Sequence, residues 1–408
     1  MSETDAHLDG GAGSQDHNSN DVDAGGGDAG GVDAGGVDAG GVDAGGLDAG
    51  GGDSGPPDSV VPPGWAFGYP ILVDTAGLTG DVENFPLPVT FTGDDVDFDA
   101  FSPDGADLRF EANGVLLPHV IDLFRVQGSV VWVRVPRLSP SEELTLWMFG
   151  GHPSPPPLPS QEMFTQVFAE DFVAVFPMTD YALAFGDIFA QHDGTYLVDG
   201  GIGRALACSD GAGFDLGRGI PWISGLARFT VSAFVHLNAP LASDFALFNV
   251  AVNAPSGATS GTSRIALEMN TNQQLRAIVR APDTAGGARL ESTAAVSEGT
   301  WHHVALAVDL PLDQVRVFLD GVDASIVDVN NGNALVQSYP FAADALDDTV
   351  SANGAICASD DLSGLFGDAL VDEVRVASAY RSAAWLAAEA RAVAPGLVTF
   401  GPREDAPP

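Results

Sequence analysis

The sequence contains no lysine, and its 16 basic residues are all arginine. They stand against 56 acidic residues, which gives 408 residues a formal net charge of -40. Proteins that bind nucleic acid or anionic membranes use basic side chains to displace counterions from phosphates. The composition therefore excludes nucleic acid as a partner and leaves neutral glycans, divalent cations and cationic proteins.

Cysteine is also scarce, since the chain has only Cys208 and Cys357. Their separation does not fit a zinc site or a redox pair. They are either two buried thiols or one disulfide formed in an oxidising compartment. A disulfide closing so long a loop would stabilise the protein by roughly 4–5 kcal/mol.

Long hydrophobic runs are absent, and no stretch approaches the ~18 residues that cross a membrane. The first residues, Met1 to Asp5, are acidic where a signal peptide would be basic and then apolar. By itself this start predicts a cytoplasmic protein without a membrane span.

Glycine and aspartate dominate the first part of the chain. Residues 23–53 repeat Asp-Ala-Gly-Gly-X with a period of five. Such a segment has little apolar surface to bury, so residues 1–62 are expected to form a disordered acidic tether. The alternative, a calcium-loaded β-roll, has a repeat of about nine residues with regular apolar positions, and this period does not match it.

The chain then changes to the period-two pattern of β-strands. Val131, Val133 and Val135 alternate with Trp132 and Arg134, which predicts a half-buried strand. A similar strand follows from residue 144 and ends at two glycines. These features predict a small antiparallel β-sandwich over residues 63–152.

A proline-rich stretch predicts a hinge and linker over residues 153–171. Beyond it, residues 172–398 show many short alternating segments that are typical of a β-sandwich. Asp320-Gly321 reads as a tight hairpin turn. Ser382 is placed to cap one short helix before Pro395. Residues 399–408 are expected to form a tail.

The first module contains, in order, residues 104–110 (DGADLRF), 116–120 (LLPHV), 131–136 (VWVRVP) and 144–151 (LTLWMFGG). These four segments resemble the bacterial family called domain of unknown function 2341, and the resemblance covers about residues 65–152.

The second module resembles the laminin-G-like, concanavalin A-like lectin/glucanase jelly rolls over about residues 172–395. The pieces that carry it, in order, are 201–206 (GIGRAL), 229–235 (FTVSAFV), 299–305 (GTWHHVA), 315–321 (VRVFLDG), 367–376 (GDALVDEVRV) and the closing helix at 381–382. The first and last strands of such jelly rolls often pair. The resemblance therefore implies that Cys208 and Cys357 are neighbours and form a disulfide.

Proteins that combine these two modules are typically exported bacterial surface proteins. By this resemblance we expect an extracellular or cell-surface location, secretion, and a lipoprotein-like tether. The true start would then lie upstream with an export signal, or export would follow an unusual route.

No catalytic constellation is present in the sequence. Jelly-roll glucanases place two carboxylates about 5–5.5 Å apart from a Glu-x-Asp-x-x-Glu strand, and this pattern is absent. The adjacent pairs Glu170-Asp171 and Asp372-Glu373 would point to opposite faces of a strand. The neighbouring histidines His302 and His303 cannot bind one metal ion from the same strand face, and packing beneath Trp301 explains them better.

Asp372 is the acid of greatest interest because strand parity places it with Val374 and Val376 on the apolar face. A buried charge must find a partner. It either bonds to backbone or arginine, which would fix the last strand, or binds a structural calcium ion. The residues considered as calcium ligands are Asp372, Asp309 and Asp215. No organic cofactor is expected.

Glycan binding uses exposed aromatic rings together with polar loop groups. Trp222, Tyr339 and Phe341 lie in expected loops, although core packing or loop anchoring also explains them. The sequence thus predicts a surface binding or adhesion protein for carbohydrate, another extracellular polymer or a surface protein, assisted by calcium. The alternatives are a glycan-degrading enzyme with an unrecognised site, or a structural envelope protein without a small ligand.

Overall fold

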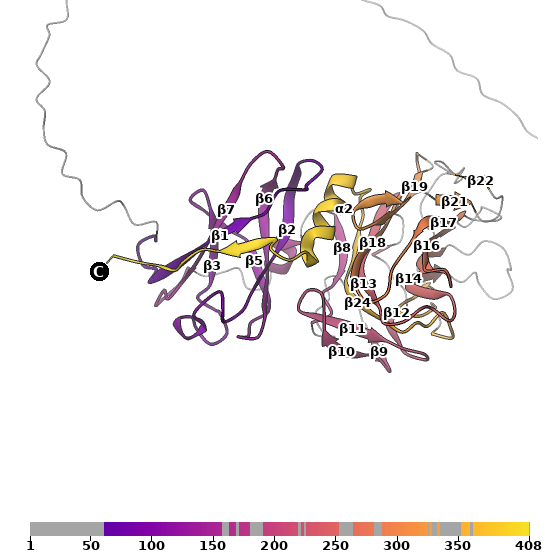
Figure 1. Ribbon diagram of the computed structural model, residues 1–408, viewed down its shortest axis with the longest axis horizontal. Coiled ribbons are helices and arrows are strands. Elements are labelled where there is room, and N and C mark those ends of the chain that lie inside the picture. The colour runs from indigo at the N-terminus through magenta and orange to yellow at the C-terminus, as the bar shows by residue number, and fades with distance from the viewer. Residues whose placement is uncertain are drawn as a thin grey trace, which may run out of the picture. The chain divides into compact units, whose positions relative to one another are not determined.

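The computed structural model divides the chain into two units, residues 1–55 and 56–408. The residues that it describes all belong to the second unit: 61–156, 163–168, 171–179, 191–218, 222–223, 226–252, 264–280, 288–312, 314–324, 326–328, 333–334, 352–359 and 362–407. The expected tether therefore lies outside the described residues, apart from residues 61 and 62. The described chain is an all-β protein with short helices, as the sequence predicted (Figure 1).

The first module consists of two antiparallel sheets. Sheet 1 has the order β25-β1-β7-β3-β4, with β26 also pairing with β1. Its strands are β1 (Phe67–Val73), β3 (Arg109–Ala112), β4 (Val115–Leu117), β7 (Leu144–Gly150), β25 (Val398–Phe400) and β26 (Glu404–Asp405). Sheet 2 has the order β2-β6-β5, formed by β2 (Val82–Phe91), β5 (His119–Leu123) and β6 (Ser129–Leu138). A short 3-10 helix, η1 (Phe98–Ala100), follows β2.

Strand β6 is buried on both of its faces from Ser129 to Val133, where a half-buried strand was expected. Val131, Val133 and Val135 belong to the core of the first module, as their alternation predicted. Trp132, on the opposite face, is also fully buried because the second module covers it. Alternation predicted only a half-buried strand, because the sequence does not show which neighbour packs on its second face.

The second module is a sandwich of two larger antiparallel sheets. Sheet 3 has the order β10-β11-β24-β13-β18-β19-β20, with β8 pairing with β24. Its strands are β8 (Phe172–Phe176), β10 (Tyr196–Asp199), β11 (Arg204–Cys208), β13 (Arg228–Leu237), β18 (Trp301–Asp309), β19 (Gln314–Leu319), β20 (Val322–Ala324) and β24 (Ala369–Ala377).

Sheet 4 has the order β22-β21-β17-β16-β15-β14-β23-β12-β9. Its strands are β9 (Gln191–Asp193), β12 (Gly213–Arg218), β14 (Phe245–Val252), β15 (Arg264–Met269), β16 (Gln274–Arg280), β17 (Ala288–Ala295), β21 (Ile326–Asp328), β22 (Asn333–Ala334) and β23 (Ala352–Ile356). The alternating apolar residues of β13, β15, β16, β18 and β19 line the core between sheets 3 and 4, so those sequence patterns are confirmed.

Local sequence patterns also predicted correctly the turn at Asp320-Gly321 and the helix that begins after Ser382. Asp320 and Gly321 have φ values of 51° and 75° and connect β19 to β20. Helix α2 (Ala383–Ala390) begins after Ser382, whose hydroxyl accepts a hydrogen bond from the Trp385 backbone N–H. A 3-10 turn, η2 (Arg391–Val393), follows it, and a short helix α1 (Met163–Val167) lies between the modules in the chain.

The two modules share a continuous apolar cluster. Helix α2 contacts β2 of the first module and β18 of the second (Figure 1). The rings of Phe85 and Trp385 lie 5.3 Å apart across this contact. The residues expected to form a tail instead contribute strands β25 and β26, which pair with β1. The end of the chain therefore completes a sheet of the first module.

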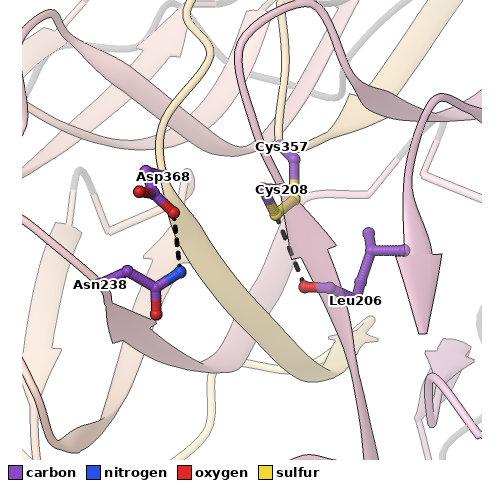
Figure 2. The surroundings of a disulfide bond; sticks show 5 residues. All are labelled: Leu206, Cys208, Asn238, Cys357 and Asp368. Atoms are coloured by element: carbon purple, nitrogen blue, oxygen red, sulfur yellow. Dashed lines mark hydrogen bonds between the residues drawn. A yellow bond between two sulfur atoms is a disulfide. The ribbon is translucent and has the colours of Figure 1, made fainter. Parts of the chain in front are cut away.

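The disulfide between Cys208 and Cys357 is present and confirms the predicted pairing (Figure 2). Cys208 ends β11 in sheet 3, whereas Cys357 follows β23 in sheet 4. The bond therefore joins the two sheets of the sandwich and does not follow from pairing of neighbouring strands. In the same region, the Asn238 side-chain amide donates to an Asp368 carboxylate oxygen at 2.7 Å and ties the end of β13 to the start of β24.

Candidate functional site

A β-bulge in β24 determines where its acidic residues lie. The pairing register of β24 with β13 shifts at Glu373, which has a φ of 51°. Because the bulge adds one residue, Val371 and Val374 both face the jelly-roll core. Strict alternation placed Asp372 on the face of Val374 and Val376, and this was wrong. Asp372 lies on the opposite face, toward the first module.

Asp372 is completely buried and holds the loop of residues 199–203. One of its carboxylate oxygens accepts a hydrogen bond from the Ile202 backbone N–H at 2.9 Å. A Cβ atom on Gly200 would lie 2.7 Å from the same oxygen, so the loop passes closely over the carboxyl. Burial and the neighbouring Glu373 raise the pKa of Asp372 well above its usual value. The backbone hydrogen bond predicted for this acid is therefore present.

Arg375 sits in a buried cluster with two glutamates. Its guanidinium contacts Glu373 at 2.9 Å and Glu389 at 3.7 Å. Burial raises the pKa of Glu373 to about 8, although Arg375 opposes the rise. Burial would also raise the pKa of Glu389, but contacts with His303 and Arg375 outweigh it and lower that pKa to about 2. The two carboxyls that contact Arg375 therefore differ in their pKa, which is raised at Glu373 and lowered at Glu389.

The first module adds a further carboxyl from β5. The Thr179 hydroxyl donates a hydrogen bond to Asp122 at 2.9 Å, and burial raises the pKa of Asp122 to about 6. The guanidinium of Arg375 lies 4.4 Å from the centre of the Trp132 ring. Polar groups of both modules therefore meet in one desolvated region beneath residues 199–203.

Above this region a cleft of about 690 Å³ opens to solvent. Its walls come from the end of β2, the β5–β6 loop and residues 199–203. The residues that line it are Thr90, Phe91, Thr92, Asp95, Arg125, Gln127, Gly128, Ser129, Val130, Asp199, Gly201 and Gly203. Gly201 and Gly203 belong to the loop that Asp372 anchors, so the buried carboxyl supports one wall of the cleft.

The polar side chains of the cleft are held by local hydrogen bonds. The Thr92 backbone N–H and hydroxyl both donate to Asp95, at 2.8 and 3.0 Å. Arg125 donates to Asp199 at 3.3 Å, which connects the two modules across the opening. The Ser129 hydroxyl accepts from the Arg125 backbone N–H at 2.9 Å. The cleft thus offers oriented donors and acceptors that suit a ligand rich in hydroxyl groups.

The sequence did not point to this cleft. Its walls come from segments that are far apart in the chain, and each segment is an ordinary turn without a recognisable motif. The one available signal was Arg125, because arginine is scarce in a chain with 56 acidic residues. That signal does not distinguish a binding residue from a structural ion pair.

The three aspartates considered for calcium have different partners. Asp215 accepts a hydrogen bond from the Gly217 backbone N–H at 2.7 Å. Asp309 accepts from the Arg228 side chain at 2.7 Å. Asp372 bonds to the loop described above. Within the described part of the chain, no three His, Cys, Asp or Glu side chains are grouped as metal ligands.

Among the candidate glycan-binding aromatics, Trp222 is partly buried and packs on the jelly-roll core. Its ring lies 6.4 Å from that of Phe176 in an edge-on arrangement. Trp222 is thus placed as a loop anchor. Tyr339 and Phe341 lie outside the described residues. Among the helices that the structure describes, none has the length and apolar character needed to cross a membrane.

Residues 220–387 match the family model of the concanavalin A-like lectin/glucanases superfamily, of laminin-G type. This supports the predicted resemblance over that part of the second module. The resemblance of residues 65–152 to domain of unknown function 2341 stays a prediction. No curated protein matches the chain.

Solved structures with a similar arrangement are distant. Domain 4 of AbnA, an extracellular arabinanase from Geobacillus stearothermophilus in complex with arabinotriose, is 16% identical with a TM-score of 0.35, over 53% of this chain and 97% of that domain. A Trypanosoma rangeli sialidase in complex with the inhibitor DANA is 12% identical with a TM-score of 0.36, over 69% of this chain and 43% of the sialidase. The binding domain of Paraclostridial Mosquitocidal Protein 1 is 11% identical with a TM-score of 0.38, over 54% and 52% of the two chains. These likenesses are too distant to carry an argument about function.

Proposed function

We propose that this chain is an exported cell-surface protein that binds a carbohydrate or another hydroxyl-rich extracellular polymer in the cleft between its two modules. The observation that carries the proposal is the lining of the cleft, where hydroxyl, amide, carboxylate and guanidinium groups converge. The fold of the second module is one that lectins and glucanases share. Fold alone does not define a ligand, so the proposal depends on the cleft.

The net charge of the chain limits the class of polymer that it can bind. A net charge of -40 repels polyanions, which favours a neutral polymer. Asp95 and Asp199 present carboxylates in the cleft, and carboxylates are hard oxygen ligands of the kind that calcium prefers. Calcium accordingly enters the proposal as an ion that assists ligand binding.

Calorimetry on the full-length chain tests this proposal. Neutral polysaccharides are titrated first in calcium and then in chelator, after a glycan array has selected them. We expect Arg125→Gln and Asp199→Asn each to weaken binding by roughly 10- to 150-fold, since one lost polar contact to a charged group is worth roughly 1.5–3 kcal/mol. Arg137→Gln is the matched control, because Arg137 forms a half-exposed ion pair with Asp81 outside the cleft lining.

Two outcomes would contradict the proposal. Equal affinity in all variants would exclude the cleft as the site, and no binding of any glycan would favour a structural envelope protein. Binding that occurs only in calcium would support calcium as an assisting ion. Equal affinity in calcium and in chelator would exclude a role for calcium and leave the cleft as the binding site.

One observation favours a glycan-degrading enzyme as the second candidate. Asp122 and Asp372, whose pKa values burial raises, lie beneath the loop that forms one wall of the cleft. Hydrolysis would require the loop to open so that two carboxyls face the polymer. Release of reducing ends from a bound polysaccharide, abolished by Asp122→Asn, would support this candidate over simple binding.

A further inference from the structure

Three side chains outside the cleft form a hydrogen-bonded chain at one end of β18. The Ser297 hydroxyl lies 2.8 Å from Nε2 of His302, and Nδ1 of the same ring lies 2.8 Å from the Asp320 carboxylate. Ser297 precedes β18, His302 belongs to β18, and Asp320 lies in the turn after β19. Strand pairing of β18 with β19 therefore brings His302 and Asp320 together, and Ser297 is five residues before His302 in the chain.

The order of these groups fixes the positions of the protons. An ionised carboxylate can only accept, so Nδ1 of His302 carries the proton that it donates to Asp320. In the neutral ring Nε2 is then the acceptor, and it receives the hydrogen bond from the Ser297 hydroxyl. Burial would raise the pKa of Asp320, but the contacts with His302 and His303 together outweigh it and the pKa is lowered. The carboxylate is also held by the His303 backbone N–H at 3.0 Å.

The two adjacent histidines have different roles. The ring of His303 is buried and contacts Glu389 at 3.3 Å inside the protein. The ring of His302 is 14% exposed and bonds only to the two groups above among the described residues. The ring of His303 packs against Phe234 with ring centroids 5.1 Å apart, so burial in the core accounts for His303 but not for His302.

The serine is accessible. Ser297 is exposed, and so are the residues that follow it up to Thr300. Gly299 has a φ of 74°, and no atom lies within 4 Å of the position that a Cβ would take. A small ester can therefore approach the hydroxyl without displacing a side chain.

We propose that Ser297, His302 and Asp320 form a hydrolytic site for small carboxylic esters, such as O-acyl groups on an alcohol. A nucleophile within hydrogen-bond reach of a base, which a third group orients, is the arrangement that activates a serine. Ser297 and His302 are the catalytic residues, and Asp320 is a positioning residue. This site is separate from the cleft lining and does not depend on glycan binding there.

The reaction needs only the ester and water. The Ser297 oxygen bonds to the carbonyl carbon while its proton moves to Nε2 of His302. The bond to the leaving alcohol oxygen then breaks, and His302 returns the proton to that oxygen. Water repeats the sequence on the acyl-serine, which releases the carboxylic acid and restores the Ser297 hydroxyl.

The experiment combines an active-site probe with a model substrate on the full-length chain. A fluorophosphonate probe is incubated with the protein, and mass spectrometry locates the adduct. Hydrolysis of p-nitrophenyl acetate is measured in parallel. We expect the adduct on Ser297 and a rate that Ser297→Ala lowers by at least about 10²-fold, since the nucleophile that His302 activates as general base is removed.

Ser154→Ala is the matched control, since Ser154 is an exposed serine whose backbone N–H bonds to His152. It should leave both labelling and hydrolysis unchanged. Asp320→Asn keeps an oxygen for the His303 N–H but presents an amide to His302, so we expect kcat to fall while KM stays the same. Thermal melting shows that each variant is folded.

The proposal is overturned if the probe leaves Ser297 unmodified, or if folded Ser297→Ala hydrolyses the ester at the wild-type rate. Labelling of Ser297 that persists unchanged in His302→Gln would also overturn it, because the histidine would then not activate the serine.

Discussion

The guanidinium of Arg375, from the last strand of the jelly roll, lies 4.4 Å from the centre of the Trp132 ring in the first module. Trp132 and Arg375 are both buried, so the contact is shielded from water. A cation above an aromatic face is attracted more strongly when both are desolvated. This pair joins the charged cluster of β24 to the first module, and the cleft lies where the same two modules meet.

Arg375→Ala is expected to destabilise the protein by about 3–5 kcal/mol, because Glu373 and Glu389 would lose their shared buried cation. Urea unfolding followed by tryptophan fluorescence measures the change. Arg137→Ala, which breaks a half-exposed ion pair, serves as control and should cost far less. A loss below about 1 kcal/mol for Arg375→Ala would show that the cluster does not depend on this cation.

Stability is expected to fall as the pH rises from about 4 to 8. Burial raises the pKa of Asp122 from 3.8 to about 6 and that of Glu373 from 4.5 to about 8. The folded state therefore holds these protons more tightly than the unfolded state, and the stabilisation is lost as the pH passes the folded pKa values. The melting temperature, measured across this range, should decline.

The variant Glu373→Gln separates the effect of these carboxyls from general charge repulsion. Glu373→Gln removes one titrating group, so its melting temperature should depend less on pH between about 5 and 8. Glu389 behaves oppositely, because its pKa is lowered from 4.5 to about 2 and its stabilisation is lost as the pH falls below 4.5. An alkaline decline as steep in Glu373→Gln as in the wild type would exclude Glu373 as a cause.

Gly200→Ala tests whether the loop supports the cleft. Its Cβ would lie 2.6 Å from the Arg204 carbonyl carbon and 2.7 Å from an Asp372 carboxylate oxygen. We expect a loss of about 1–3 kcal/mol in stability, since backbone must move to relieve the overlap. Calorimetry should also show weaker ligand binding, because residues 201 and 203 line the cleft.

Gly364→Ala is the matched control for this substitution. No atom lies within 4 Å of its would-be Cβ, so its stability and affinity should stay close to the wild type. If Gly200→Ala binds the ligand as tightly as Gly364→Ala, the loop does not shape the binding site.

Removing the disulfide is expected to destabilise the second module strongly. The bond between Cys208 and Cys357 closes a loop with a sequence separation of 149 residues. The double substitution Cys208→Ser and Cys357→Ser should lower the free energy of unfolding by roughly 4–5 kcal/mol. Urea unfolding with and without reductant checks this. Reductant should destabilise the wild type and leave the double variant unchanged, and an equal response of the two would contradict the role of the bond.

The sequence predicted features that depend on neighbours in the chain. Alternating residues such as Val231 and Val235 marked strands, because side chains of a strand point to opposite faces. Asp320 and Gly321 marked a hairpin, and Ser382 marked the helix start. The disulfide between two cysteines was inferred from the resemblance to a jelly roll. These signals are local or come from a family pattern.

Alternation did not give the correct position of Asp372. One extra residue at Glu373 reverses the face of every residue before it, and nothing in the sequence marks the bulge. The alternation pattern also missed the burial of Trp132, because the sequence of a strand does not show what packs on its outer face. The sequence also did not predict the cleft or the Ser297–His302–Asp320 chain, because the residues that form them come from separate segments that only the fold brings together.

By itself, then, the sequence determined the all-β class, the strand pattern, one turn and one helix, because period-two alternation and capping act over a few residues. Its charge also limited the kinds of partner. Tertiary structure alone decided which faces are covered, which carboxyls lose water and which distant side chains meet. Desolvation and contact depend on the packing of segments such as β5, β18 and β24 against one another, and that packing is a property of the whole chain.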